Sequence, residues 1–580
     1  MNLQKKAVLV ALASCLALTV FLLCFFLRGK TDPLTHREGP SMSVTYREWA
    51  TAIDEHQCTD ISKNLYSRGA TVADVAVATL LCLGVVLPES LGIGGGFLAI
   101  YFRHSTGTVH FLDARETAPN AATRDMFIGK ANRDIGPESV AVPGEIRGYR
   151  ELLDFIGSNV TQRDIFENAI RLARDGFVVG KHMERAMEMK RDIIYASDEL
   201  RKLYFDEVKN STRKFNETIH NPFLAETLEK LAASNDFAKE FYEGSVGEAI
   251  VDRLKAMGGL LTREDLASYK ALWKKPTHST VKDKFDVYSA GLSGSGAVLS
   301  MMVNIMDTFN ADDFAKETRK TYHRLVEAMK FAYAKRSLLG DDQFVNTSEL
   351  IKEMQDRHFA ERIRKKISDT HTLPLAEYGG AQTEAHDQGT SHANFFAPNG
   401  DVLAITSTIN YYFGSGVQIE GIILNNEMDD FSTPNETNGF GLMPSESNFI
   451  EPGKRPMSSM APTVIVERNG KANMAIGGAG GSKITTALAE FLLHYLYQGY
   501  NIGDAIAHSR VHHQYIPNRI VYDQHFDPDI IKGLQKFGHE TYKNPPNVRG
   551  SVVVAIAREG SHLIAAIDPR KGGGSSGGRL

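Results

Sequence analysis

The alternation of apolar and polar positions divides the chain into an N-terminal apolar segment, a long helical region and a C-terminal region of strands. Residues 7–27 contain no charged side chain, and about 20 apolar residues match the hydrocarbon core of a bilayer. This predicts a transmembrane signal-anchor, with residues 1–6 as a cytoplasmic tail and residues 28–50 as a stalk. A cleaved signal peptide is the alternative. Its apolar region is normally shorter and ends in small residues, whereas residues 25–28 read Phe-Phe-Leu-Arg.

Helical spacing of apolar side chains dominates between residues 70 and 380. Residues 161–174 carry their Ile, Ala and Leu side chains on one face, which predicts an amphipathic helix. Thr262 with Asp265 is typical of a helix start, because the two side chains can cap each other's backbone N–H groups. The same helical pattern recurs in residues 223–233, 246–257 and 321–334, and strand-like pieces occur at 97–103 and 109–112.

Strand patterns take over near residue 390. Three pairs of apolar runs are each joined by a short turn that ends in Gly, and such turns between alternating runs are a strong local signal for a β-hairpin. The turns are Asn399-Gly400, Asn469-Gly470 and Glu559-Gly560. Residues 484–498 are apolar nearly all round and predict a buried helix. The Gly- and Ser-rich residues 571–580 predict a mobile tail.

The composition, with 42% hydrophobic and 23% charged residues among 580, is that of a globular protein. The net charge of −5 argues against a nucleic-acid partner, because such binders usually carry a basic excess. Cys58 and Cys82 are the two cysteines outside the apolar segment. In an oxidising compartment they predict one disulfide, with two buried thiols as the alternative. Five Asn-x-Ser/Thr sequons favour an extracellular body and begin at Asn159, Asn210, Asn216, Asn346 and Asn435.

The run from Gly389 to Ala393 reads Gly-Thr-Ser-His-Ala and allows two catalytic interpretations. One makes Ser391 a nucleophile in a motif that resembles G-x-S-x-G. That motif needs a helix after the serine, and here a strand pattern follows. The other makes Thr390 the first residue of a chain released by cleavage after Gly389. Its hydroxyl would be the nucleophile and its own α-amine, with a pKa near ~7.7–8.0, the base. An ordinary loop is the plainer alternative.

Several further motifs accompany this run in a fixed order. They are Thr406 to Asn410, Asn425 to Phe431, Pro452-Gly453-Lys454, Ser458-Ser459-Met460 and Gly478 to Gly481, preceded by residues 113–119 and 142–148. In this order they resemble the γ-glutamyltransferase family, also called glutathione hydrolases, of the N-terminal-nucleophile superfamily. The resemblance covers residues 50 to 572. The apolar segment, the sequons and the cysteine pair look like the eukaryotic, membrane-anchored branch.

The resemblance implies a fold and a division of the chain. The expected fold class is α+β, an αββα four-layer sandwich of the N-terminal-nucleophile hydrolase type, preceded by one transmembrane helix. Self-cleavage between Gly389 and Thr390 would give a heavy chain, whose part of the ectodomain is residues 51–389, and a light chain, residues 390–580. The two chains are expected to stay together as a heterodimer. The resemblance implies no cofactor, and we expect no metal.

The resemblance also implies catalytic roles. Thr390 is the expected nucleophile, and Thr408 steadies its hydroxyl. Gly480 and Gly481 match the glycines of an oxyanion hole, where backbone N–H groups without side chains can approach a developing negative charge closely. For these glycines the plainer alternative is a turn that precedes a helix.

Substrate-binding roles follow in the same way. Arg115 is expected to bind the α-carboxylate of a γ-glutamyl group through its planar guanidinium, with the hydroxyls of Ser458 and Ser459 as further donors. The α-ammonium is assigned to Glu427 and Asp430, with Asn410 beside them. A structural ion pair of Arg115, a serine turn and a solvated acidic loop are the plainer alternatives.

The expected activity is hydrolysis of glutathione and its conjugates, with transfer of the γ-glutamyl group to water, amino acids or dipeptides. The expected localisation is the cell membrane, as a single-pass type II protein with an extracellular catalytic domain. A catalytically silent, uncleaved cell-surface interaction protein is the alternative. An acylase for another acyl group is disfavoured, because a simple acyl chain needs no pocket with both charges.

Overall fold

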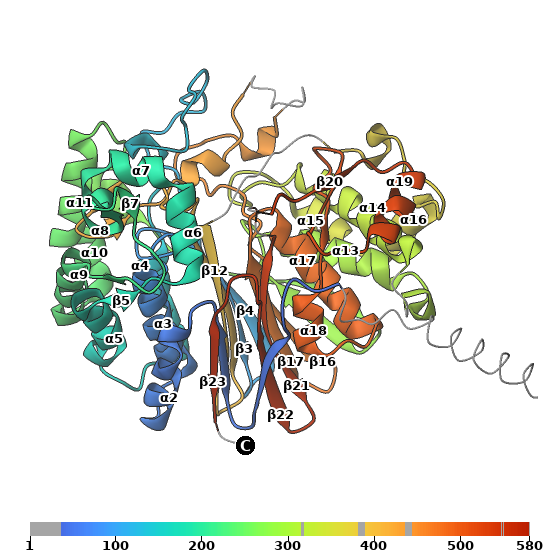
Figure 1. The fold of residues 1–580 in the computed structure, drawn as a ribbon, viewed down its shortest axis with the longest axis horizontal. Coiled ribbons are helices and arrows are strands. Elements are labelled where there is room, and N and C mark those ends of the chain that lie inside the picture. Colours follow the sequence, from blue (N-terminus) through green and yellow to red (C-terminus); the bar gives the residue numbers. More distant parts are fainter. Residues whose placement is uncertain are drawn as a thin grey trace, which may run out of the picture.

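Two seven-stranded antiparallel sheets lie face to face in the middle of the molecule, and helices cover both outer faces (Figure 1). The computed structural model describes residues 36–314, 318–380, 389–434, 444–546, 548 and 550–578. Within this part of the chain the four layers run helix, sheet, sheet, helix. The αββα sandwich expected from the family resemblance is therefore confirmed.

The sheets are built from segments that lie far apart in the sequence. The first has the order β23 (Gly574–Gly577), β2 (Ala50–Ile53), β12 (Gly389–Phe396), β13 (Val402–Asn410), β3 (Gly96–Arg103), β4 (Thr108–Ala114) and β9 (Leu272–Lys274). The second has the order β1 (Met42–Tyr46), β22 (His562–Ile567), β21 (Val552–Glu559), β17 (Ala472–Ala479), β16 (Thr463–Glu467), β11 (Phe285–Ser289) and β10 (Thr277–Val281).

The helices fall into two groups (Figure 1). On the left are α2 (Asp60–Ser67), α3 (Val72–Val86), α4 (Glu145–Ile156), α5 (Gln162–Asp175), α6 (Lys181–Met189), α7 (Arg191–Ala196), α8 (Asp198–Tyr204), α9 (Pro222–Ala233), α10 (Phe237–Glu243), α11 (Ser245–Ala256) and α12 (Arg263–Ser268). On the right are α13 (Gly296–Asp307), α14 (Arg319–Arg336), α15 (Ser348–Gln355), α16 (Arg357–Lys366), α17 (Lys483–Leu492), α18 (Ile502–Ala507) and α19 (Pro528–Lys536).

Short strands complete the described secondary structure. They form the pairs β5 (Phe177–Val178) with β8 (Thr218–Ile219), β6 (Phe205–Asp206) with β7 (Ser211–Thr212) and β14 (Gln418–Ile419) with β15 (Ile422–Ile423). A small three-stranded sheet contains β18 (Val511–His512), β19 (Ile520–Tyr522) and β20 (Thr541–Lys543).

The central strands are buried on both faces, and their alternation explains which side chains meet. On β12, Phe395 packs in the core beneath the left-hand helices, whereas Phe396 packs in the core that includes the second sheet. Successive side chains of a strand point to opposite faces. Even-numbered positions of β12 therefore face the second sheet, and odd-numbered positions face the helices.

The local predictions hold well. The three predicted hairpins are β12–β13, β16–β17 and β21–β22, and residues 97–103 and 109–112 lie in β3 and β4. The four helical ranges correspond to α5, α9, α11 and α14. Thr262 and Asp265 cap each other's backbone N–H groups at the start of α12, as their spacing predicts. The predicted helix at 484–498 is α17, followed by a wider helical turn at Leu493–Tyr497.

Two predictions about the ends of the fold are wrong. The tail is not wholly mobile, because Gly574–Gly577 form β23 and pair with β2. The stalk cannot extend to residue 50, because Met42–Tyr46 form β1 and pair with β22. Both are edge strands that bury little side-chain surface, so their hydrophobic signal in the sequence is weak.

The predicted localisation as a single-pass type II membrane protein is not borne out. Among the residues that the structure describes, no helix is both long and apolar enough to cross a bilayer. The 18-residue helix α14, for example, contains Arg324, Glu327 and Lys330. The predicted anchor at residues 7–27 lies outside the described residues.

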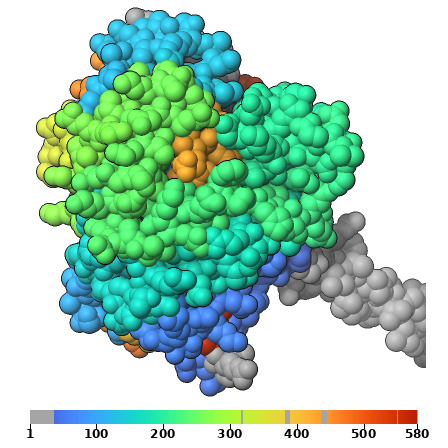
Figure 2. Space-filling view, turned by 90° about the vertical axis from the view of Figure 1, so that its left-hand side faces the viewer, coloured from blue at the N-terminus to red at the C-terminus, as the bar shows by residue number. Residues whose placement is uncertain are grey.

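The parts of the chain before and after residue 390 interleave throughout the fold. In the first sheet β12 and β13 lie between β2 and β3, which come from the earlier part. The hairpin β14–β15 of the later part inserts between helices of the earlier part, and its orange surface shows among the green helices in Figure 2. There Asn221 Nδ2 donates to the carbonyl of Gly421 at 3.1 Å. Each buried apolar cluster found among the described residues contains side chains from both parts.

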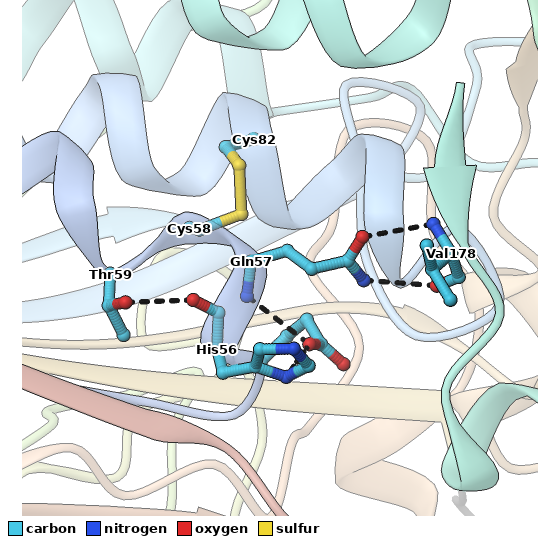
Figure 3. Close-up of a disulfide and its surroundings, with 7 residues drawn as sticks. His56, Gln57, Cys58, Thr59, Cys82 and Val178 are labelled. Carbon is cyan, nitrogen blue, oxygen red and sulfur yellow. Dashed lines mark hydrogen bonds and ion pairs between the residues drawn. A yellow bond between two sulfur atoms is a disulfide. The ribbon is translucent and has the colours of Figure 1, made fainter. Parts of the chain in front are cut away.

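Cys58 and Cys82 form the predicted disulfide, with their Cα atoms 5.9 Å apart (Figure 3). It joins the short helical turn at His56–Cys58, which follows β2, to helix α3. Beside it the Gln57 amide donates to the Val178 carbonyl at 3.0 Å and accepts from the Val178 N–H at 2.9 Å. The segment after β2 is thus tied to two neighbouring elements.

Candidate active site

Thr390 lies near the start of β12 and is buried, with 1% of its surface exposed. It is an even-numbered position, so its side chain belongs to the face between the two sheets. Ser391 points the other way, and its hydroxyl donates to Asp54 Oδ2 at 3.0 Å. The strand continues to Phe396 without a helix, so the geometry does not fit an elbow with Ser391 as nucleophile.

The Thr408 hydroxyl is the centre of a small hydrogen-bond network. It donates to the carbonyl oxygen of Gly389 at 2.5 Å and accepts from the N–H of Asn410 at 2.9 Å. A hydroxyl carries one proton, and the Gly389 carbonyl cannot donate. In the 3.3 Å contact between the two threonine hydroxyls, Thr390 is therefore the donor and Thr408 the acceptor.

Glycine is required before Thr390 for a steric reason. A Cβ atom at Gly389 would lie 2.6 Å from the carbonyl carbon and oxygen of Tyr411 and 2.8 Å from the carbonyl oxygen of Asn410. The β12–β13 pairing also shifts register between Gly389 and Thr390. The peptide bond between these two residues thus lies at a local irregularity with no room for a side chain.

Gly480 and Gly481 follow β17 in the second sheet, which packs against β12. Their φ angles are 125° and 61°, and non-glycine residues rarely adopt such values. A Cβ at Gly480 would lie 2.9 Å from Ser551 Cα. Their carbonyl oxygens accept from the N–H groups of Lys483 and Ile484 at the start of α17, which fixes the orientation of this turn.

Thr390 and Gly480 line the same cavity of about 250 Å³. Its wall also includes Tyr412, which packs edge-on against the His182 ring with 5.5 Å between centroids. The other predicted site residues do not line it. The cavity therefore joins two of the predicted catalytic residues but excludes the predicted γ-glutamyl-binding side chains.

Those binding side chains instead gather around the Arg115 guanidinium, which is 1% exposed. Its Nη1 lies 2.9 Å from Glu427 Oε2, and its Nη2 forms an ion pair with Asp430. Glu116 Oε2 is 3.7 Å from Nη1. The residues assigned to opposite ends of a zwitterion therefore pair with each other in this structure.

Asn410 and the two serines border this cluster. Asn410 Nδ2 donates to the carbonyl of Asn426, the residue before Glu427, at 3.1 Å. The Ser459 hydroxyl accepts from Arg336 Nη2 at 3.2 Å, and the Ser458 hydroxyl accepts from the N–H of Met460 at 3.2 Å. Arg115 Nε donates to the carbonyl of Pro456 at 3.3 Å, which ties the serine segment to the cluster.

Burial shifts the pKa of several groups near the site. Burial raises the pKa of Glu116 to about 8, and the charge of Arg115 opposes that shift. The pKa of Glu145 is also raised to about 8 by burial. Both oxygens of Glu145 accept from Ser407 on β13 at 3.0 Å. Burial lowers the pKa of His392 to about 4, so this ring is neutral near pH 7.

Sequence analysis missed Lys571 and Asp54. Lys571 Nζ donates to the carbonyl oxygen of Thr390 at 2.9 Å and to Asp54 Oδ2 at 2.8 Å. Asp54 Oδ2 also accepts from the N–H of His392 at 3.1 Å. The available signal was Lys571 itself, a charged side chain directly before a run of Gly and Ser.

One cluster has the side chains of a metal site. Single ligand atoms of His323, Glu327 and His539 lie within 4.8 Å of one another. However, Lys330 Nζ is 3.2 Å from Glu327 Oε1 and 3.2 Å from His539 Nδ1. Its ammonium group neutralises the only carboxylate of the three, so the cluster fits a buried ion-pair network better than a metal site.

The sequons are accessible where the structure describes them. Asn159, Asn210, Asn216 and Asn346 are exposed, and Asn435 lies outside the described residues. Exposure is a requirement for glycosylation, and the modification itself stays a prediction.

Comparison with known proteins identifies the family. A model of the family described as Gamma-glutamyltranspeptidase matches residues 58–578. Scoloptoxin SSD14 from Scolopendra dehaani is 39% identical over 552 residues, which cover 94% of this chain and 94% of that protein. Glutathione hydrolase 3 from Arabidopsis thaliana is 38% identical over 478 residues, 81% of this chain and 74% of that protein.

Among solved structures, cephalosporin acylase from Bacillus halodurans superposes with a TM-score of 0.81 at 23% identity, over 94% of this chain and 98% of that one. At this identity the likeness shows a common fold. The family match and the two relatives support a family assignment, because they extend over most of the chain and the relatives have higher sequence identity. The chain belongs to the gamma-glutamyltranspeptidase family.

Proposed function

We propose that this protein is a glutathione hydrolase and γ-glutamyltransferase that works through a γ-glutamyl ester of Thr390. One observation carries the proposal: the Thr390 hydroxyl directly follows a sterically required glycine, donates to Thr408 and lines a cavity with Gly480. One cut in the chain, between Gly389 and Thr390, would make Thr390 an N-terminal residue that carries both this hydroxyl and a free α-amine.

The first step proposed is self-cleavage. Thr390 Oγ1 attacks the carbonyl carbon of Gly389, and its hydroxyl proton passes to the peptide nitrogen. The C–N bond then breaks, the nitrogen leaves as the Thr390 α-amine, and an ester remains. Water then hydrolyses the ester, giving the Gly389 carboxylate and restoring the hydroxyl. The hydrogen bond from Thr408 to the Gly389 oxygen favours the attack, because it stabilises negative charge that develops on that oxygen. The products, residues 1–389 and 390–580, stay together through their shared sheets.

Turnover then uses the new N-terminus. The α-amine, with a pKa near ~7.7–8.0, takes the proton of the Thr390 hydroxyl as it attacks the γ-carbonyl of the substrate. Gly480 and Gly481 donate N–H groups to the oxyanion. The amine of cysteinylglycine leaves with a proton, and water, an amino acid or a dipeptide later takes the γ-glutamyl group from the ester.

Recognition of the γ-glutamyl group is assigned to the Arg115 cluster. Its α-carboxylate binds Arg115, and Ser458 and Ser459 supply hydroxyl donors. Its α-ammonium binds Glu427 and Asp430, beside Asn410. The assignment is supported by the gathering of one cation and two carboxylates at one place, and a bound zwitterion would replace their mutual ion pairs with pairs to its own two charges.

The test is a denaturing gel of the purified full chain, N-terminal sequencing of the smaller band, and release of glutamate from glutathione. The proposal requires a band of about 190 residues that begins at Thr390, together with glutamate release. A single intact chain without γ-glutamyl activity would favour the silent interaction protein instead.

A further inference from the structure

In the first sheet, β2 pairs with the later part of β12. The ladder between the two strands begins at Ala393, which lies opposite Ile53, the last residue of β2. On its other side, β12 is already paired with β13 at Thr390. Thr390 and His392 are both buried, so those of their backbone groups that point toward β2 need partners other than that strand.

Two charged side chains supply these partners. Lys571 Nζ donates to the carbonyl oxygen of Thr390 at 2.9 Å, and Asp54 Oδ2 accepts from the N–H of His392 at 3.1 Å. The N–H and C=O of one strand residue point to the same side, and so do those of the residue two positions on. Both contacts therefore lie on the side of β2. Lys571 Nζ and Asp54 Oδ2 are 2.8 Å apart, so an ion pair continues the sheet where the backbone of β2 ends.

The two members of this pair come from opposite ends of the described chain. Asp54 directly follows β2 and is 1% exposed, whereas Lys571 precedes β23 and is 7% exposed. The tail approaches β2 very closely here, because a Cβ at Gly573 would lie 2.4 Å from the carbonyl oxygen of Ile53. This close approach, together with the pairing of β23 with β2, brings Lys571 to the backbone of Thr390.

This contact bears directly on the geometry of an N-terminal nucleophile. The proposed cut removes the covalent bond on the N-terminal side of Thr390, so its main chain gains a freedom of rotation that an internal residue does not have. The bond from Lys571 fixes the direction of the Thr390 carbonyl. The α-amine, which replaces the N–H, points to the same side as this carbonyl. A misplacement of about 1 Å at a reacting group can cost about 10²-fold in rate.

We propose that Asp54 and Lys571 are positioning residues for Thr390, which hold its main chain so that the hydroxyl stays directed toward Thr408 and the cavity. The inference rests on the proposed function. After the cut, Asp54 belongs to the heavy chain and Lys571 to the light chain, so both chains hold the nucleophile. An ion pair that merely supports the fold would affect stability and leave turnover by the folded, cut enzyme unchanged.

Kinetics of the cut enzyme test the proposal, with rates expressed per cut chain on a denaturing gel. Lys571→Met and Asp54→Ala should each lower kcat for γ-glutamyl-p-nitroanilide about 10²-fold, with KM within about threefold of the wild type. Because the two side chains act as a unit, the double variant should lose at most about threefold more than the worse single variant. Lys571→Arg keeps the charge and the donor and should recover about tenfold of the loss.

The matched control is Lys330→Met on α14, which removes another buried lysine from an ion pair, here with Glu327 at 3.2 Å. It should lower stability and leave kcat unchanged. A wild-type kcat in Lys571→Met, an equal loss of kcat in the control, or additive losses in the double variant would each overturn the proposal. Each single variant decides alone if the other does not fold.

Hydrogen exchange tests the pair without turnover and so separates its failure from that of the proposed function. In the uncut Thr390→Ala chain, Lys571→Met should speed exchange of the His392 amide about tenfold, because Asp54 loses the partner that holds it in place. The amides of residues 393–396 should keep their protection. Unchanged exchange at His392 would contradict the positioning role, whether or not the wild type hydrolyses a γ-glutamyl compound.

Discussion

The hydroxyl of Thr408 donates a 2.5 Å hydrogen bond to the carbonyl oxygen of Gly389, the residue before the proposed nucleophile. The hydroxyl oxygen of Thr408 in turn accepts the proton of the Thr390 hydroxyl. One side chain thus contacts both the attacking oxygen and the oxygen on which negative charge would develop. This pairing makes the self-cleavage step open to direct experiment.

Replacing Thr390 by Ala should abolish both the cut and γ-glutamyl turnover, because no other hydroxyl occupies its position on the inner face of β12. A denaturing gel and a γ-glutamyl-p-nitroanilide assay check the two losses. Ser391→Ala is the neighbouring control and should be cut normally, since that hydroxyl faces Asp54. The reverse result would assign the nucleophile to Ser391.

Thr408→Val keeps the shape of the side chain and removes the donor to Gly389. We expect the cut to slow by about 10²–10³, the usual effect of losing one donor to an oxyanion. Time-resolved gels of freshly refolded chain measure the rate. Thr408→Ser retains the hydroxyl and should stay within a few-fold of the wild type. Normal cleavage of the valine variant would show that this hydrogen bond is only structural.

Arg115→Lys keeps a positive charge but loses the planar fork that contacts Glu427 and Asp430. We expect KM for γ-glutamyl-p-nitroanilide to rise at least tenfold with a smaller change in kcat, because the substrate carboxylate loses a bidentate partner. Arg253→Lys, at an exposed ion pair with Glu199, is the matched control. A large fall in kcat at constant KM would argue against a binding role.

Glu145→Gln should flatten the dependence of stability on pH. Burial raises the pKa of Glu145 to about 8 in the folded protein, against about 4.3 in an unfolded chain. At pH values between these two pKa values, the folded state holds one proton more than the unfolded state. The unfolding free energy of the wild type therefore falls as pH rises, and this group contributes about 1.4 kcal/mol per pH unit.

Glutamine does not titrate, so the difference between variant and wild type should show this slope from about pH 5 to pH 7.5. Urea unfolding of both proteins in the uncut Thr390→Ala background measures it, because that chain unfolds as one molecule. Parallel curves for the two proteins would mean that Glu145 is ionised when folded.

Removing the disulfide by Cys58→Ala with Cys82→Ala should lower the unfolding free energy by about 3 kcal/mol, the loop-closure contribution expected for a separation of 24 residues. Urea unfolding in the same uncut background measures the loss. Treating the unsubstituted uncut chain with a reductant should give a similar loss. No change in either case would mean that packing around α3 holds this segment without the bond.

The sequence predicts the parts of the fold that local chemistry determines. The hairpin β16–β17 is signalled by Asn469-Gly470, and α12 is signalled by the mutual capping of Thr262 and Asp265. The strand β23 has no such signal. It is built of Gly and Ser, and only its pairing with β2, more than 500 residues earlier in the chain, makes it a strand.

The candidate site shows the same limit. The order of the motifs predicts which residues matter, and the structure brings Thr390, Thr408 and Gly389 into contact. The ion pairs of Arg115 and the contact of Lys571 with Asp54 depend on how distant segments pack. No local spacing predicts them, because each partner comes from a different strand end.

The interleaving of the two parts of the chain sets the order of two events, folding and the proposed cut. Before the cut, folding is a first-order process that each molecule completes alone. After the cut, a denatured molecule consists of two separate polypeptides. Because both contribute strands to each sheet of the folded protein, they must meet again in solution, and the recovery of folded protein then depends on protein concentration. A molecule found cut and folded has therefore passed through the intact chain, and its later lifetime is governed by the rate of unfolding rather than by an equilibrium.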